Sequence, residues 1–233
     1  MASETVKIAT PDGEFSAYVA RPDRPGKSPA VVVIQEIFGV NAVMREIADG
    51  LASIGYLAIC PDLFWRIEPG VDITDKSEAE WKKAFALMNA FDTDKGIADI
   101  QATINFARKD EGSTGRVGAV GYCLGGKLAY LTATRTDINA SVSYYGVGIE
   151  NLLSEAAQIR TPLLMHIAGA DQFVPPPAQE KIVAALEGHP KVEIHTYPGR
   201  DHAFARKGGE HYDASDAAVA DIRTLAFFNN NLA

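Results

Sequence analysis

The segment with the clearest chemical signal has a cysteine at its centre. Residues 121–126 read Gly-Tyr-Cys-Leu-Gly-Gly, which is the G-x-S-x-G pattern of a nucleophile elbow with cysteine in place of serine. An apolar run precedes this segment and a helical pattern follows it, as a strand–turn–helix elbow requires. Small neighbours allow the sharp turn, and the start of a helix favours a thiolate. Cys123 is therefore the candidate nucleophile, and the alternative is a glycine-rich turn that only packs.

An acid and a base follow Cys123 in the order that such a site needs. Asp171 comes after a predicted strand at 162–168, and His202 comes after a predicted strand at 192–197. Nucleophile, acid and histidine is the chain order of a triad built on a nucleophile elbow. Open α/β sheets place their sites at the carboxyl ends of strands. We expect His202 to take the proton of Cys123, and Asp171 to orient the imidazole.

Other acids and histidines fit these roles less well. Asp201 is a rival acid, but side chains of adjacent residues rarely point at one another, and Asp201 is next to His202. The remaining histidines lie inside a predicted strand, lack a suitable loop, or are too close to the last helix: His166, His189, His195 and His211. We expect His166 to be a core residue. No cluster of His or Cys has the spacing of metal ligands, so we expect no metal and no cofactor.

The loop after the first buried strand is a third candidate part of the site. Residues 35–39 read Gln-Glu-Ile-Phe-Gly, and in folds with a nucleophile elbow the corresponding loop donates an N–H to the oxyanion. Ile37 would supply one donor, and Leu124, directly after the nucleophile, the other. Glu36 is an unusual residue at such a place, and a solvated loop carboxylate is the alternative interpretation.

Short apolar runs alternate with longer helical patterns, which predicts an α/β fold with a mostly parallel sheet flanked by helices. The strands are expected at 14–20 (an edge strand), 30–34, 56–60, 116–120, 140–145, 162–168 and 192–197. The helices are expected at 41–55, 77–89, 93–108, 124–135, 177–186 and 213–229. Asn41 and Thr93 are predicted N-caps, and Ser77 with Glu80 has the pattern of a capping box.

Length and composition suit one domain over residues 1–233, in which 62–92 would form a short cap over the site. The formal charge of −8 argues against nucleic-acid binding, although one local arginine suffices for a small anion. No apolar run reaches the ~18 residues of a membrane span, and the first residues lack a signal peptide. We expect a cytoplasmic monomer or weak homodimer without membrane contact. Cys60, in an apolar run, is expected to be a buried small hydrophobe.

Taken together, several segments resemble the dienelactone hydrolase family (carboxymethylenebutenolidases) of the α/β-hydrolase superfamily. The resemblance extends over nearly the whole chain and rests on Gln35–Gly39, Pro61–Phe64, Gly118–Gly126, Asp171 with Val174–Pro175, and Tyr197–Arg206. It implies an α/β-hydrolase fold. It also implies that Glu36 takes the thiol proton when substrate binds, so that a Cys123 thiolate faces a protonated His202. Arg206 matches the family arginine that binds the substrate carboxylate, and a solvated loop cation is its alternative.

The resemblance is weaker in the cap. Family members active on dienelactone carry a second carboxylate-binding arginine and a tyrosine where ungapped placement puts Trp81 and Phe85 here, and a serine at the position of Ala203. These differences imply a less anion-selective, more apolar pocket. The alternative is that Trp81 and Phe85 are plain core residues.

The function that we expect is hydrolysis of carboxylic esters or lactones, with Cys123 attacking the acyl carbon of a small-molecule substrate. That substrate is expected to include carboxylate-bearing esters or enol-lactones. The nearest alternative is another acyl chemistry on the same triad, in a thioesterase or a broad arylesterase. A second alternative, from a different class, is a non-catalytic protein of the same fold that binds a ligand or senses redox state.

Overall fold

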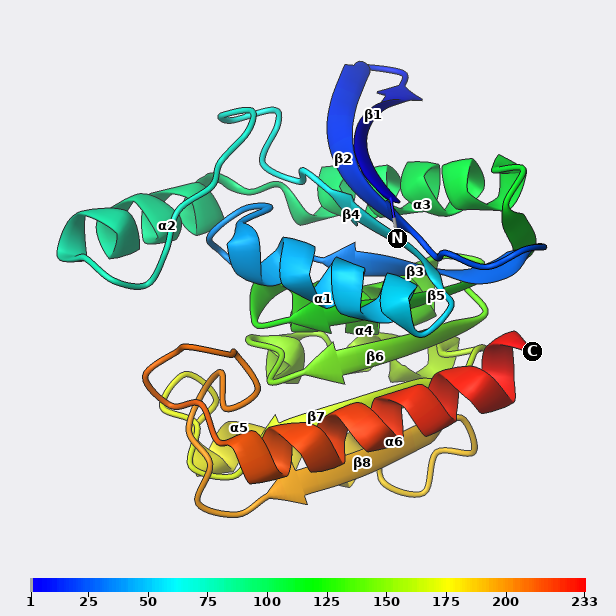
Figure 1. Cartoon of the computed structure of the whole chain (residues 1–233). Helices are drawn as coiled ribbons and strands as arrows, with labels where there is room; N and C mark the ends of the chain where they lie inside the picture. The colour runs from blue at the N-terminus through cyan, green and yellow to red at the C-terminus, as the bar shows by residue number, and fades with distance from the viewer. Residues whose placement is uncertain (1) are drawn as a thin grey trace. The chain divides into compact units, whose positions relative to one another are not determined.

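The computed structural model describes residues 2–233, and their contacts divide the chain into two compact units, Met1–Ala119 and Val120–Ala233. Figure 1 shows the path of the chain through both units. One strand, β5 (Ser113–Tyr122), begins in the first unit and ends in the second. Whether 1–233 acts as one domain, with 62–92 as its cap, remains a prediction.

Strands of both directions make up the first unit, in the order β1-β2-β4-β3-β5. The four that precede β5 are β1 (Ala2–Thr10), β2 (Gly13–Arg21), β3 (Ser28–Ile34) and β4 (Leu57–Pro61). β3 pairs with β4 in parallel, whereas β2 pairs antiparallel with both β1 and β4. The prediction that 14–20 is an edge strand is therefore wrong, because β1 lies outside it. β1 is largely exposed and buries only Ile8, so its apolar signal in the sequence is weak.

Two helices of the first unit begin at the predicted caps. The side chain of Asn41 accepts a hydrogen bond from an amide in the first turn of α1 (Ala42–Ser53). For α2 (Glu78–Ala90), the Ser77 hydroxyl accepts from the Glu80 amide at 3.3 Å and donates to the Glu80 carboxylate at 2.8 Å. A free N–H at each helix start is thus satisfied by a side chain. Both caps are confirmed.

The third helix of this unit, α3 (Thr93–Lys109), has a different cap from the predicted one. The carboxylate of Asp92 accepts from the amides of Asp94 and Lys95 at 3.0 and 3.1 Å. Thr93 is the first helical residue and not the cap. Both residue types are suitable caps, so the sequence alone does not decide between neighbours.

The second unit has parallel strands and helices on both sides of them. Its strands are β6 (Ala140–Tyr144), β7 (Leu163–Ala168) and β8 (Val192–Tyr197), and both strand pairs are parallel. Its helices are α4 (Leu124–Arg135), α5 (Pro176–Leu186) and α6 (Ala214–Leu232), with two 3₁₀ turns, η1 (Ile149–Asn151) and η2 (Leu153–Gln158), that the sequence did not predict. Figure 1 shows α6 running along β7 and β8. The α/β fold class with a mostly parallel sheet is confirmed.

None of the helices of residues 2–233 is long and apolar enough to cross a membrane.

A buried polar network joins the three parallel strands to α6. His166 lies 2.9 Å from the Tyr197 hydroxyl through Nδ1 and 3.0 Å from the Thr224 hydroxyl through Nε2. The Tyr144 hydroxyl is 2.7 Å from that of Thr224. Burial, with positive charges nearby, lowers the pKa of His166 to about 3, so the ring is neutral and has one donor and one acceptor for the two hydroxyls. The prediction of a core histidine is confirmed.

Candidate active site

Cys123 occupies a sharp turn between a strand and a helix. β5 ends at Tyr122 and α4 begins at Leu124, and Cys123 between them has φ 57° and ψ −113°. For a residue other than glycine, a backbone with positive φ costs about 1–3 kcal/mol of conformational free energy. It persists only where the surrounding structure enforces it. Here the Cys123 amide donates to the Tyr144 carbonyl at 3.1 Å, and the Cys123 carbonyl accepts from Gly126 at 3.0 Å. This is the local geometry of a nucleophile elbow.

Two glycines make the close approach possible. A Cβ on Gly121 would lie 1.9 Å from the Gly125 carbonyl oxygen, and a Cβ on Gly126 would lie 2.4 Å from the Tyr144 carbonyl oxygen. Side chains do not fit at such distances. The start of α4 can therefore pack directly on the end of β6, and the turn at Cys123 is fixed by backbone contacts.

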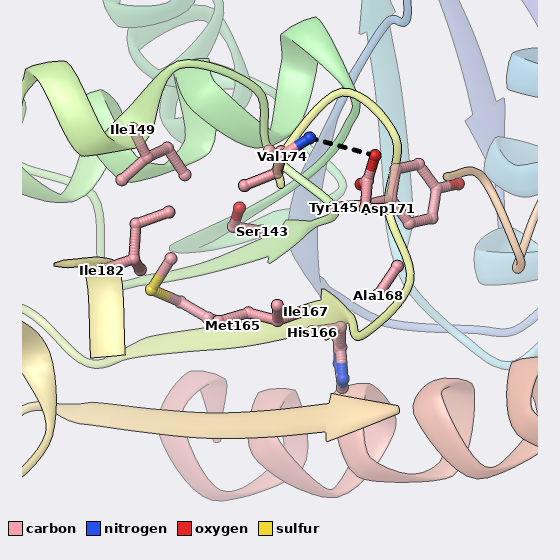
Figure 2. Close-up of a pocket in the computed structure, with 11 residues that line it drawn as sticks. Ser143, Tyr145, Ile149, Met165, His166, Ile167, Ala168, Asp171, Val174 and Ile182 are labelled. Atoms are coloured by element: carbon pink, nitrogen blue, oxygen red, sulfur yellow. Dashed lines mark hydrogen bonds between the residues drawn. The ribbon is translucent and has the colours of Figure 1, made fainter. Parts of the chain in front are cut away.

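His202 and Asp171 form a buried hydrogen-bonded pair. They lie in the loops after β8 and β7, and His202 Nδ1 is 2.8 Å from Asp171 Oδ2, with 4% and 1% of the two side chains exposed. The other carboxylate oxygen, Oδ1, accepts from the amides of Phe173 and Val174 at 2.8 and 3.3 Å. Figure 2 shows the bond to Val174. The carboxylate is thus held by its own loop on one side and holds the imidazole on the other.

The same imidazole interacts with the cysteine. Burial alone would lower the pKa of His202, but the charge of Cys123 and hydrogen bonds to Asp171 and Cys123 outweigh burial and raise this pKa to about 10. Because Nδ1 is engaged by Asp171, Nε2 is the ring nitrogen that faces the sulfur. The arrangement brings the three predicted triad residues together within the second unit, and it can hold a proton on His202 beside a cysteine at neutral pH.

Two aromatic rings, which the sequence analysis did not single out, enclose His202. Tyr145 contacts it edge-on at 5.1 Å between ring centroids, and Phe173 does so at 4.9 Å. Tyr145 is buried and has φ 37°, whereas Phe173 is 42% exposed. Their signal in the sequence is positional, because Tyr145 directly follows β6 and Phe173 lies two residues past Asp171. Phe173 therefore covers the imidazole on its solvent side.

Arg206 and Leu124 also belong to the second unit. Arg206 is 7% exposed, and its amide donates to the Ala203 carbonyl at 2.9 Å. The alternative of a solvated loop cation is therefore wrong. Leu124 is the first residue of α4, so its amide has no carbonyl of an earlier helical turn to bond. Such an amide is suited to an oxyanion.

Glu36 and Ile37 follow β3 in the first unit, in a loop that is closely held. Glu36 is 1% exposed, which excludes the alternative of a solvated carboxylate. The Gln35 side chain donates to the Glu36 carbonyl at 3.3 Å and accepts from the Leu63 amide at 2.9 Å. The loop after β3 is thereby tied to the loop after β4. Any part that Glu36 and Ile37 play in the reaction remains a prediction.

Trp81 and Phe85, in the first unit, form a partly exposed aromatic stack on α2. Their ring centroids are 5.5 Å apart, and the Trp81 and Phe38 rings meet at nearly a right angle with centroids 5.1 Å apart. The indole also donates to the Asp75 carbonyl at 3.0 Å. Both side chains are half-buried, so the alternative of plain core residues does not describe them.

A small cavity lies beside Asp171 in the second unit (Figure 2). It measures about 10 Å³ and is lined mainly by apolar side chains such as Met165, Val174 and Ile182, with Tyr145 and Asp171 at one end. This volume holds one water molecule at most, so the cavity is not a substrate site. Across residues 2–233, no group of three or more His, Cys, Asp or Glu side chains is arranged to hold a metal ion.

Comparison with known proteins places this geometry in a family. The model of the "Dienelactone hydrolase family" matches residues 15–232. A "putative carboxymethylenebutenolidase" of Azospirillum brasilense is 54% identical over 222 residues, which cover 95% of each chain. A carboxymethylenebutenolidase of Pseudomonas putida is 41% identical over 228 residues, or 97% of this chain and 96% of that protein. The crystal structure of a "putative dienelactone hydrolase" from Klebsiella pneumoniae superposes with a TM-score of 0.87 at 29% identity over 98% of both chains. The chain therefore belongs to the dienelactone hydrolase family of ester and lactone hydrolases.

Proposed function

We propose that the chain hydrolyses carboxylic esters and lactones through a cysteine nucleophile, with Cys123, His202 and Asp171 as the catalytic triad. The observation that carries the proposal is the buried Asp171–His202 pair, whose imidazole also hydrogen-bonds to a cysteine at a strained turn. A thiolate beside an imidazolium is an activated nucleophile. The names of the relatives, carboxymethylenebutenolidases, agree with a lactone as substrate.

The reaction divides into two halves. The Cys123 thiolate adds to the acyl carbon, and the carbonyl oxygen becomes an oxyanion that the Leu124 and Ile37 amides stabilise. The C–O bond then breaks, and the leaving oxygen takes the proton of His202, which leaves a neutral imidazole and a thioester on Cys123. In the second half His202 removes a proton from water, which attacks the thioester. Collapse of that intermediate releases the acid and restores the thiolate and the imidazolium.

Glu36 and Arg206 have supporting roles in this proposal. Glu36 accepts the thiol proton when substrate arrives, as the family resemblance implies, and returns it to the Cys123 thiolate after the acid is released. The resting cysteine is then a thiol, which limits its oxidation. Its burial supports a specific role, because a buried carboxylate requires partners. Arg206 binds the carboxylate of a substrate through its planar fork of donors.

The preferred substrates carry a leaving group that is stable as an anion. A thiolate is itself a good leaving group, so an alkoxide with a higher basicity would be retained and the thiolate expelled. Enol-lactones and aryl esters avoid this reversal because an enolate or a phenolate leaves readily. The family resemblance implies an arginine and a tyrosine, in members active on dienelactone, at the positions of Trp81 and Phe85. The aromatic pair therefore favours less anionic and more apolar substrates.

A substrate panel and one variant test the proposal. We expect turnover of enol-lactones and p-nitrophenyl esters by the wild type, and faster hydrolysis of these than of acyl thioesters. Cys123→Ser should keep the fold and lose at least about 100-fold in kcat, because the site is not suited to ionise an alcohol. Equal turnover by Cys123→Ser would refute a thiolate mechanism.

The same substrate panel, together with ligand binding by Cys123→Ala and labelling with iodoacetamide, separates an enzyme from a binding or redox-sensing protein. A non-catalytic protein would turn over no ester of the panel, and Cys123→Ala would bind ligands as the wild type does. An enzyme should instead react with iodoacetamide at Cys123, and a substrate analogue should slow that reaction.

A further inference from the structure

One carboxylate outside the proposed triad joins the two loops that carry its acid and its base. Oδ1 of Asp201 accepts a hydrogen bond from the Gln172 amide at 3.1 Å and another from the His202 amide at 2.6 Å. Gln172 directly follows Asp171. A single oxygen atom therefore lies between the backbone next to the acid and the backbone of the histidine.

The two loops already run side by side before they reach this bridge. The Gly169 amide donates to the Tyr197 carbonyl at 2.9 Å, and the Ala170 amide donates to the Arg200 carbonyl at 2.8 Å. A Cβ on Gly169 would come within 2.9 Å of the Tyr197 carbonyl oxygen, which shows how close the backbones are. The hydrogen bonds of Asp201 extend this contact between the two loops to Gln172, next to the proposed acid, and to His202, the proposed base.

The outer oxygen of the same carboxylate has a much weaker contact. Oδ2 of Asp201 lies 3.8 Å from Nε2 of His211, and about a third of each side chain is exposed. This distance exceeds that of a hydrogen bond, and an exposed ion pair contributes little. The structural effect of Asp201 therefore comes from its inner oxygen. Asp201 does not act as a rival acid through that oxygen, which is bonded to the His202 amide and not aimed at the imidazole.

We propose that Asp201 is a positioning residue, which sets the separation of His202 from Asp171 by accepting both amides on one oxygen. The inference rests on the proposed triad. A hydrogen bond of 2.8 Å between His202 and Asp171 tolerates little displacement, and misplacement of a catalytic group by about 1 Å can cost about 100-fold in rate. Without the bridge, the loop after β8 is free to move relative to the loop after β7.

Three substitutions separate geometry from charge. Asp201→Asn keeps an oxygen at the bridge without the charge, Asp201→Glu keeps the charge but moves the oxygen by one methylene, and Asp201→Ala removes both. We expect Asp201→Asn to retain kcat within about 3-fold, and the other two to lose about 10- to 100-fold in kcat with little change in KM. His211→Ala is the control, and it should behave as the wild type because the outer contact is not a hydrogen bond.

NMR spectroscopy supplies a measurement that needs no turnover. In Asp201→Ala and Asp201→Glu, the His202 Nδ1–H resonance should move upfield as the bond to Asp171 lengthens, and the Gln172 and His202 amides should exchange faster. In Asp201→Asn these signals should stay near those of the wild type. If the wild type hydrolysed no ester but the signals behaved in this way, the proposed reaction would fail and the positioning role would stand.

Two results would overturn the inference. One is an Asp201→Glu protein with wild-type kcat and wild-type His202 signals, since the displaced oxygen would then not matter. The other is an Asp201→Asn protein as slow as Asp201→Glu, since a charge and not a bridge would then be required. Because Asp201→Asn and Asp201→Glu both keep a polar side chain, they decide the question even if Asp201→Ala does not fold.

Discussion

At the scale of single residues, the protonation of His202 depends on groups that oppose one another. Burial favours the neutral ring, whereas Asp171 and the charge of Cys123 favour the imidazolium and raise its pKa to about 10. A raised pKa means that the proton is kept through neutral pH and lost only in alkaline solution. The protonation of His202 is therefore set by its neighbours Cys123 and Asp171 and not by the bulk solvent.

A variant without the Cys123 sulfur tests how far the pKa of His202 depends on that residue. In Cys123→Ala the charge and the hydrogen bond that raise the pKa of His202 are gone, while burial remains, so the pKa should fall well below about 10. The imidazole should then lose its proton at a lower pH than in the wild type. An NMR titration of the His202 ring in both proteins, each with a substrate analogue bound so that the wild-type cysteine is a thiolate, measures the difference. An unchanged titration would mean that Cys123 does not interact with His202.

At the scale of elements, the strand–turn–helix at Cys123 depends on backbone contact between α4 and β6. Most elements were predicted from apolar runs and caps, and α4 has the predicted limits. β1 was missed because it buries little, and the cap of α3 was placed one residue late because Asp92 and Thr93 are both suitable. The positive φ of Tyr145 was not predictable either, because it follows from where β6 meets its neighbours.

A pair of glycine substitutions tests the contact. Gly126→Ala would place a Cβ 2.4 Å from the Tyr144 carbonyl oxygen, so α4 must shift, and we expect a loss of about 2–4 kcal/mol in the free energy of unfolding. Gly50→Ala, in α1, meets nothing within 4 Å and should stabilise by about 0.5–1 kcal/mol. Urea unfolding measures both. Wild-type stability of Gly126→Ala would show that the two elements are not in contact.

At the scale of the whole molecule, a chain with a formal charge of −8 is proposed to accept substrates that include anions. The electrostatic field of the negatively charged molecule disfavours anions, so their recognition must be local. Arg206 is a buried cation on the same loop as His202.

The order of Cys123, Asp171 and His202 along the chain could be predicted from the sequence. Their mutual distances, the bridge at Asp201 and the rings around His202 could not, because they follow from how loops pack.

The role of Arg206 can be tested with matched substrates. Arg206→Gln should raise KM by about 10-fold or more for an ester that carries a carboxylate, and should change KM little for the neutral ester of the same size. Steady-state kinetics on the two substrates give the comparison. An equal rise in KM for both would remove Arg206 from substrate recognition and assign it to the structure of its loop.

The most direct test of the central claim is to look for the covalent intermediate. A slowly turned-over p-nitrophenyl ester is mixed with the wild type, the reaction is quenched in acid, and intact and peptide masses are measured. The account predicts one added acyl group, located on the peptide that contains Cys123 and absent from Cys123→Ala. Turnover of the ester with no acyl group on Cys123, or with the group on another residue, would contradict it.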